Sequence, residues 1–252
     1  MALIETESLI LKTYNLAEAD KIVVLFTQDH GIVRGVAKGA KRLQSKFGSG
    51  LEPFSVVKVT YFEKEVVELV SIQKVELIRS YFRAASDPDF LAKFSYLSDI
   101  LMALSPPHDP NATLYRMANA CLDAADHDVG GLLPLGVYFE LWLLRLNGLL
   151  PDWSRCGACR RVFDDTEVAD LTANFHLLCG RCSRSPASRG FDVQHRSIFS
   201  AVQRLSAADF ASTVSLSAAH MTDVSAVLKR LLSHAIGREI STERAFGSGH
   251  SL

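Results

Sequence analysis

The spacing of hydrophobic residues changes once along the chain, near residue 80. Before that point, short runs rich in Val, Ile, Thr and aromatic residues are separated by turn-like stretches, which is the pattern of β-strands. The predicted strands are residues 7–15, 20–28, 31–38, 55–63 and 65–77. Five short strands within about 80 residues favour a small closed barrel, because closure leaves no exposed sheet edge.

The longest gap between predicted strands, residues 39–53, separates the third strand from the fourth. A five-stranded barrel of the OB-fold type commonly carries an extra helix at this place, and OB folds often bind oligonucleotides. Residues 1–80 are therefore predicted to form an OB-fold barrel that binds DNA. This is an analogy of fold, so the function has to be argued from particular residues.

Beyond residue 80 the apolar positions recur at helical spacing. Asp87 is the predicted N-cap of the first helix, and Thr222 and Gly237 are predicted to begin and end the last one. The predicted helices are residues 86–104, 111–125, 134–147, 193–205 and 222–240. The fold class is therefore predicted as α+β with several domains, in which an all-α domain, 81–252, follows the barrel.

Composition fits a folded protein without a general polyanion-binding surface. Of 252 residues, 48% are hydrophobic, and the formal net charge is −1. Residues 131–150 resemble a membrane span, but Glu140 and Arg145 interrupt them, and each such charge costs about 2.5–3.5 kcal/mol at a bilayer centre. We interpret this stretch as a buried helix. With no signal-peptide pattern at residues 1–12, a cytoplasmic protein with no membrane partner is expected.

Four of the five cysteines form the pattern C-x2-C-x19-C-x2-C, with the ligand candidates Cys156, Cys159, Cys179 and Cys182. A tetrahedral zinc site needs four such ligands, and an all-thiolate set leaves no open position for catalysis. We predict a structural Zn2+ in a zinc-knuckle insert, residues 153–186. Two alternatives are reduced cysteines that only pack, and a site in which His176 replaces Cys182. The fifth cysteine, Cys121, is expected to fill the core.

Basic residues are concentrated in residues 31–50, which contain no Asp or Glu. The candidate DNA-binding residues are Arg34, Lys38, Lys41, Arg42 and Lys46. Cations along a groove neutralise phosphates and release counterions, and Gly35, Gly39, Gly48 and Gly50 would let a DNA backbone approach closely. The alternative is a solvated loop whose charges only aid solubility. Aromatic residues for base stacking are available, although most are expected to fill the barrel: Tyr14, Phe26, Phe47, Phe54, Tyr61 and Phe62.

Two enzyme classes find no support in the sequence. No stretch matches the phosphate-binding loop G-x-x-x-x-G-K-[ST]. A zinc deaminase of nucleobases would need H-x-E followed by P-C-x-x-C, and neither half is present. The chain is therefore expected not to be an enzyme. The main alternative to DNA binding is a protein-interaction or transcription adaptor that uses its zinc knuckle as a docking surface.

The order of these features resembles one family, the bacterial RecO DNA repair proteins. The resemblance lies in ESLILKTYNLAEADKIVVLFTQDHGIVRGVAKGAKRLQSKFGSGLEPF, in the two cysteine pairs and in the closing LLSHAIGREISTERAF. It implies an N-terminal OB barrel, a helical domain and a zinc knuckle. It also implies a recombination mediator that binds single- and double-stranded DNA, anneals complementary strands and helps to load RecA.

The resemblance further implies two protein partners, RecR and the acidic C-terminal tail of single-stranded DNA-binding protein (SSB). By position, the DNA contacts of the family fall here on Arg34, Lys38, Lys41, Arg42 and Lys46. The resemblance assigns no residue to the pocket for the SSB tail. Lys93 or Arg116 could supply the cation that an acidic peptide requires.

Overall fold

The computed structural model describes residues 2–63, 68–127, 129–183, 190–213 and 218–240. These residues form two compact units, of which the first extends to Val129 and the second covers Gly130–Ile240. Each unit is considered by itself. Residues 65–67 of the fifth predicted strand, 184–186 of the predicted insert and 241–252 lie outside the described residues.

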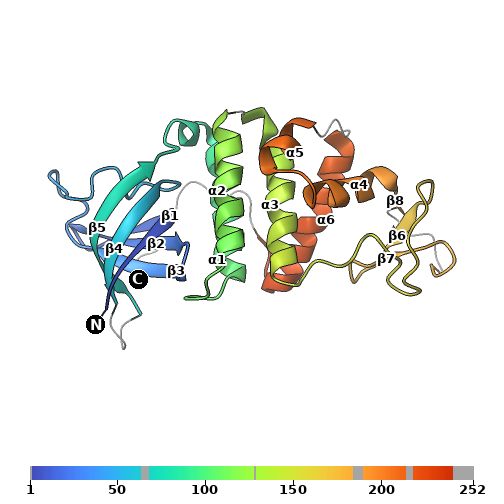
Figure 1. The fold of residues 1–252 in the computed structure, drawn as a ribbon, viewed down its shortest axis with the longest axis horizontal. Coiled ribbons are helices and arrows are strands. Elements are labelled where there is room, and N and C mark those ends of the chain that lie inside the picture. The colour runs from blue at the N-terminus through green and yellow to red at the C-terminus, as the bar shows by residue number, and fades with distance from the viewer. Residues whose placement is uncertain (1, 64–67, 128, 184–189, 214–217, 241–252) are drawn as a thin grey trace. The chain divides into compact units, whose positions relative to one another are not determined.

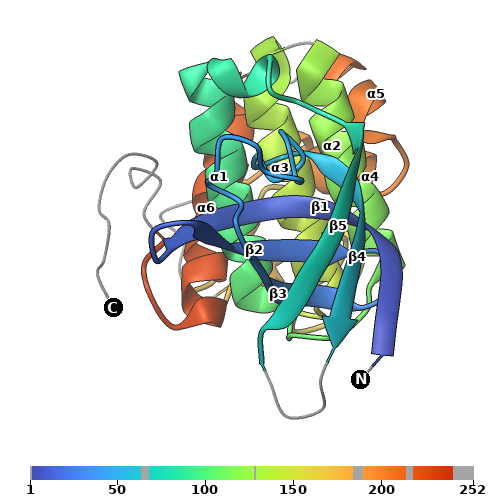
Figure 2. The same cartoon turned by 90° about the vertical axis from the view of Figure 1, so that its left-hand side faces the viewer.

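All five predicted strands are present in the first unit (Figure 1). They are β1 (Ala2–Leu16), β2 (Asp20–Thr27), β3 (Gly31–Ala37), β4 (Val56–Glu63) and β5 (Val70–Arg79). Together they form a closed barrel in the order β1-β2-β3-β5-β4, in which β4 pairs back onto β1. The neighbours are antiparallel except β3 and β5, which are parallel. Figure 2 shows β4 and β5 running across the other three strands.

Alternate side chains of these strands fill the interior, as the two-residue period of a strand requires. The core cluster takes residues from every strand and from the segment after β3: Ile10, Val23, Leu25, Val33, Ala37, Phe47, Leu51, Val57, Val59, Tyr61, Val70 and Ile72. β3 can pass close to β5 because Gly35 has no side chain. A Cβ there would lie 2.8 Å from a carbon of Ile72 and 2.9 Å from one of Val70.

The segment between β3 and β4, residues 38–55, contains no helix, contrary to the expectation for this gap. It is a succession of turns, in which backbone N–H groups bond to carbonyls three residues earlier, as in Arg42 to Gly39, Ser45 to Arg42 and Gly48 to Ser45. Gly39 and Gly48 have φ of +72° and +53°, which a right-handed helix does not allow. The left-handed glycines therefore replace the expected helix with turns.

Two helices belong to the same unit as the barrel. These are α1 (Pro88–Leu104), preceded by the short 3-10 helix η1 (Ala84–Ser86), and α2 (Ala112–His127). Asp87 caps α1 as predicted, because its side chain accepts hydrogen bonds from the N–H groups of Asp89 and Phe90. The rings of Phe54 and Phe90 meet edge to face at 6.0 Å. The compact units thus divide after residue 129, whereas the strand-to-helix transition lies near residue 80.

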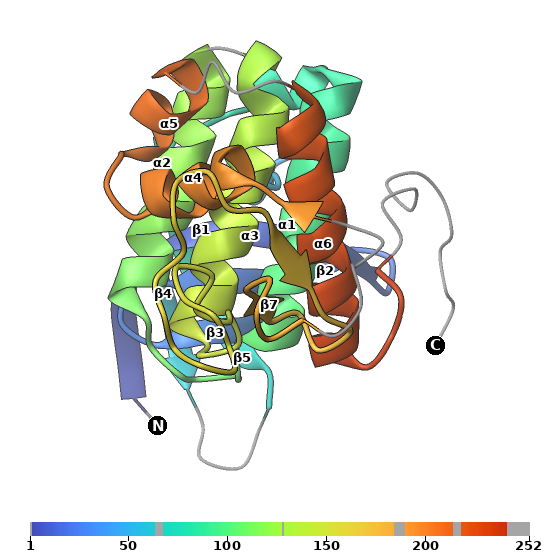
Figure 3. The ribbon, with the colours of Figure 1, turned by 90° about the vertical axis from the view of Figure 1, so that its right-hand side faces the viewer.

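The second unit consists of helices and a small sheet. After η2 (Val129–Gly131) come α3 (Leu132–Leu146), α4 (Val193–Val202), α5 (Ala207–Thr213) and α6 (Ala218–Ile236). α3 packs against α6, and Figure 3 shows these two helices side by side. Most of α3 is buried, including Glu140 at 1% exposure, as expected for a core helix. None of the helices in the described part of the chain is long and apolar enough to cross a bilayer.

Two details of the helical pattern were predicted wrongly. α6 begins at Ala218, so Thr222 lies inside the helix, and its hydroxyl donates to the carbonyl of Ala218 instead of capping. Gly237 does follow the helix end, with φ of +74°. α5 was not predicted, although Ser206 caps its start: the Ser206 hydroxyl accepts the N–H of Asp209 and donates to the Asp209 carboxylate.

Candidate nucleic-acid interface and metal centre

The basic segment is attached to the barrel by two apolar side chains. Phe47 and Leu51 are 3% and 2% exposed and belong to the barrel core cluster. The backbone N–H of Gly39 also donates to the Asp20 carboxylate at 2.7 Å, and that of Lys41 donates to Ala19 at 2.9 Å. The segment therefore lies over the barrel and next to the β1–β2 turn, held at several points.

The five candidate cations of this segment are all exposed: Arg34, Lys38, Lys41, Arg42 and Lys46. Arg34 and Lys38 stand four residues apart along β3 and its continuation, which places them on one face. Lys41 and Arg42 follow in the turns beside Ala17–Ala19, where Lys41 Nζ lies 3.5 Å from the Ala17 carbonyl. Lys46 lies over the ring of its neighbour Phe47, 5.1 Å from the centroid.

These five cations differ from other lysines and arginines of the same unit in that they form no ion pair with a carboxylate of the described residues. Ion pairs with carboxylates engage five cations elsewhere in the unit: Lys12, Lys21, Lys58, Lys74 and Arg79. Among the described residues, no carboxylate pairs with any of the five cations of the basic segment. Their charge is therefore not neutralised within the described residues and faces the solvent.

The glycines of the segment serve the barrel and its turns. A Cβ on Gly50 would lie 2.7 Å from a methyl carbon of Val75, and Gly35 is packed against β5. The expectation that these two glycines let a DNA backbone approach is therefore wrong, because side chains of the barrel itself occupy the space. Gly48 faces open space, with no atom near the position of a Cβ.

Most of the aromatic residues considered for base stacking are inside the protein, as expected. Phe26, Phe47, Phe54 and Tyr61 are 1–3% exposed, whereas Tyr14 on β1 is 50% exposed. Tyr14 is thus the exposed ring among these.

The cysteine pairs meet in the second unit, which also contains the sheet formed by β6 (Ala169–Leu171), β7 (Leu177–Leu178) and β8 (Gly190–Phe191); Cys179 directly follows β7. Their four sulfur atoms lie within 4.8 Å of one another. Cys159 and Cys179 are 3.8 Å apart at Sγ, which is the edge of a tetrahedron with ligands about 2.3 Å from a central Zn2+. A disulfide would need about 2.05 Å. The donor set and its spacing therefore fit a Zn2+ ion.

Each cysteine pair is shaped by a tight turn. Arg160 N–H donates to the Cys156 carbonyl and Cys182 N–H to the Cys179 carbonyl, both at 2.9 Å. The Cys179 N–H points at Cys156 Sγ, 3.4 Å away. The cluster contains all four cysteines and excludes His176, whose side chain is exposed. The geometry thus favours the four-cysteine set over the alternative with His176.

Local hydrogen bonds shift the acidity of these thiols. Burial raises the pKa of Cys156, but hydrogen bonds from the backbone N–H groups of Cys159, Cys179 and Ala158 lower it to about 6. Hydrogen bonds with Cys179 and Cys159, together with burial, raise the pKa of Cys182 to about 12. Thiolates are the form that binds metal, so backbone N–H groups prepare part of the cluster for an ion.

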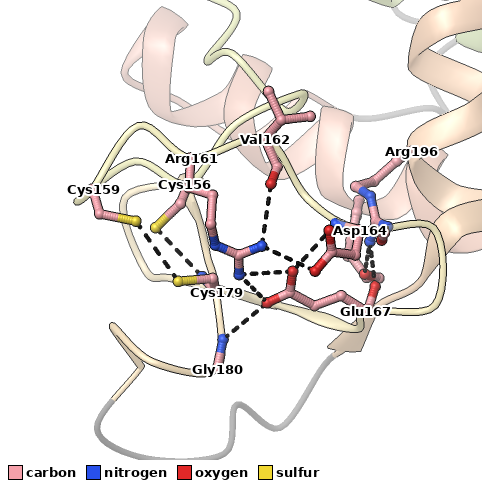
Figure 4. A network of polar contacts seen from close by, with 10 residues as sticks. Cys156, Cys159, Arg161, Val162, Asp164, Glu167, Cys179, Gly180 and Arg196 are labelled. Carbon is pink, nitrogen blue, oxygen red and sulfur yellow. Dashed lines mark hydrogen bonds and ion pairs between the residues drawn. The ribbon is translucent and has the colours of Figure 1, made fainter.

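A polar network supports the cluster from one side (Figure 4). Arg161 donates to both oxygens of Glu167, at 2.7 and 2.9 Å. Glu167 also accepts the N–H of Gly180, at 3.3 Å, inside the second cysteine turn. From α4, Arg196 donates to the carbonyls of Glu167 and Asp164, at 2.7 and 2.8 Å. This network, which sequence reasoning missed, ties the cysteine turns to a helix.

Lys93 and Arg116 were suggested as the cation of a peptide pocket, and the structure places both of them on helices of the first unit. Lys93 lies on α1, and Arg116 is exposed on α2, where it contacts Thr113 at 3.5 Å. A pocket of about 490 Å3 is present instead in the second unit, between the segment 148–151, Phe175 and the end of α6. Neither Lys93 nor Arg116 lines it.

The described residues thus define an α+β protein in which a five-stranded N-terminal sheet with a basic, solvent-facing segment precedes helices that carry a four-cysteine cluster. Residues 1–81 match the family model described as "Recombination protein O N terminal", and residues 85–244 match "Recombination protein O C terminal". The chain belongs to the RecO family.

Individual relatives agree with this assignment, and each carries the name DNA repair protein RecO. The relative from Koribacter versatilis is 33% identical over 217 residues, which is 82% of this chain and 83% of the relative. That from Geobacter metallireducens is 31% identical over 186 residues, 73% and 75% of the two chains. One from Anaeromyxobacter dehalogenans is 26% identical over 248 residues, 96% and 94% of the two chains.

Proposed function

We propose that this protein is a DNA-binding recombination mediator in DNA repair and that it is not an enzyme. Its barrel binds single- and double-stranded DNA through Arg34, Lys38, Lys41, Arg42 and Lys46. The observation that carries the proposal is that these exposed cations have no carboxylate partner among the described residues, although ion pairs are common elsewhere in the unit. Such charges attract phosphates, and they release counterions when they bind them.

The membership in the RecO family supports the finer parts of the proposal. The protein anneals complementary strands and, together with RecR, assists the loading of RecA onto DNA covered by SSB, whose acidic C-terminal tail it contacts. It works in the cytoplasm, close to the chromosome. The barrel belongs to the OB type, which the strand order β1-β2-β3-β5-β4 supports.

Zn2+ has a structural role in this proposal. Cys156, Cys159, Cys179 and Cys182 hold it as a complete set of four thiolates, so no position is left for a substrate or a water molecule. The ion stabilises the insert, residues 153–186, whose described part contains only short strands of two or three residues.

The salt dependence of DNA binding tests the proposal. Each phosphate contact with single-stranded DNA contributes about 0.7 to the slope of log K against log salt concentration, so five contacts give about −3.5. The triple variant with Lys38, Lys41 and Arg42 changed to Ala retains two contacts, for which a slope of about −1.4 is expected. Its affinity should fall for all DNA sequences alike, because phosphates carry no sequence information.

A matched control removes the same charge from the same unit. In it, Lys12, Lys58 and Lys74, which pair with Asp99, Glu5 and Glu76, are changed to Ala. Both triple variants change the net charge equally, so a general electrostatic attraction would affect both equally. Wild-type affinity in the first variant would refute the assignment and favour the adaptor that binds proteins through its knuckle. An equal loss in both variants would also refute the assignment, because it would indicate a general electrostatic attraction.

A further inference from the structure

A second cluster of possible metal ligands lies in the second unit, apart from the cysteines in the sequence. Asp192, His195 and His220 each offer a ligand atom within 4.8 Å of the others. Asp192 caps the N-terminus of α4, His195 lies in the first turn of that helix, and His220 lies near the start of α6. Figure 3 shows both helices, which pack against each other.

Both imidazole rings converge on one carboxylate. His195 Nδ1 is 2.9 Å from Asp192 Oδ1, and His220 Nε2 is 3.1 Å from Asp192 Oδ2. The ring centroids of the two histidines are 4.5 Å apart. Ligands about 2.0–2.2 Å from an ion in tetrahedral geometry are separated by about 3.3–3.6 Å, so a small movement of these side chains admits a metal ion.

A carboxylate lies near each ring nitrogen of His195. Its Nδ1 is 2.9 Å from Asp192 Oδ1, and its Nε2 is 3.7 Å from Asp223 Oδ2. A neutral imidazole has one N–H and one bare nitrogen, so one nitrogen can bind a metal while the other donates to a carboxylate. The ring is 7% exposed and is stacked on Phe191, which restricts its reorientation.

We propose that Asp192, His195 Nδ1 and His220 Nε2 bind a divalent transition-metal ion that links α4 to α6. Asp223 then accepts the Nε2–H of His195, which is the usual outer partner of a metal-bound histidine. Two imidazoles and one carboxylate suit Zn2+, Co2+, Ni2+ or Fe2+. The site has three protein ligands and a different donor chemistry from the four-thiolate cluster.

Titration of the full-length protein with Co2+ tests the proposal. The protein is first saturated with Zn2+ at the cysteines and freed of loosely bound metal. Wild type should bind one additional Co2+, with weak visible bands and without the near-ultraviolet charge-transfer absorption that thiolate ligands produce. The absence of additional Co2+ uptake, or uptake with thiolate absorption, would overturn the proposal.

Three variants locate the ion. His220→Gln should weaken the additional uptake at least tenfold, while His234→Gln, an exposed histidine on the same helix, should leave it unchanged. Asp192→Asn retains a good N-cap for α4 and should also weaken uptake, so a loss there does not reflect a lost helix. Circular dichroism confirms folding of each variant. Uptake that is equal in wild type, His220→Gln and Asp192→Asn would contradict the assignment.

Discussion

The attachment of the basic segment to the barrel leads to a prediction for Phe47→Ala. The Phe47 ring is 3% exposed and lies in the barrel core, next in sequence to Lys46, whose Nζ is 5.1 Å from the ring centroid. Truncation of a buried Phe to Ala costs about 3–5 kcal/mol, because both burial and packing are lost. Phe47→Ala removes no charge, so any loss of DNA affinity in this variant would come from displacement of the basic segment from the barrel.

Hydrogen exchange followed by mass spectrometry is the suitable assay. Both tryptophans, Trp142 and Trp153, lie in the second unit, so their fluorescence does not follow the barrel. Peptides from β2 and β3 should exchange about 100-fold to several thousand-fold faster in Phe47→Ala, since each 1.4 kcal/mol is about tenfold.

Leu43→Ala provides the control, because Leu43 is in the same segment and fully exposed. Surface substitutions of this kind stay within about 0.5 kcal/mol, so exchange should be close to wild type. Equal exchange in the two variants would show that Phe47 does not hold the segment on the barrel.

Three further predictions concern the metal, a helix cap and pH. In Trp142→Phe, removal of the cysteine-bound metal by a chelator should shift the fluorescence emission of Trp153 to the red. Trp153 is 1% exposed and its indole donates to the Phe175 carbonyl inside the insert, so loss of the insert's structure would expose it to water. Unchanged emission after complete metal loss would contradict a structural role for the metal. Asp87→Ala should lower the free energy of unfolding measured in urea by about 1 kcal/mol, whereas Asp87→Asn should leave it almost unchanged, because Asn is also a good N-cap. Equal losses in the two variants would rule out capping by Asp87. Burial and the nearby Glu63 raise the pKa of Tyr61 to about 12, so the neutral ring stabilises the barrel below pH 10 and this stability declines as pH rises from 10 towards 12. The free energy of unfolding of Tyr61→Phe should therefore fall by about 2 kcal/mol less than that of wild type over that range, and parallel pH profiles would refute this prediction.

Features fixed by local sequence were predictable here. Short runs rich in Val, Ile and Thr identified β2 and β3, and Asp87 followed by Pro88 identified the start of α1. The cysteine spacing predicted a cluster that the structure brings together. Each of these signals lies within a few residues or in a known spacing, so no knowledge of the tertiary fold was required.

Features that depend on tertiary contacts were not predictable. Gly35 and Gly50 were assigned to DNA approach because the sequence does not show that β5 passes beside them. Asp192-x-x-His195 and His220-x-x-Asp223 are visible as separate pairs, but only the packing of α4 on α6 makes them one cluster. The end of α6 was marked by Gly237. Its start was misplaced because Thr222, the predicted cap, lies inside the helix with its hydroxyl bonded to a carbonyl one turn earlier.

The central claim is that the exposed cations of the barrel contact the sugar–phosphate backbone. Its most direct test is the affinity of the full-length protein for a single-stranded oligonucleotide, measured by fluorescence anisotropy over a range of salt concentrations. We predict a slope of log K against log salt concentration of about −3.5. A slope near zero for wild type would contradict the claim.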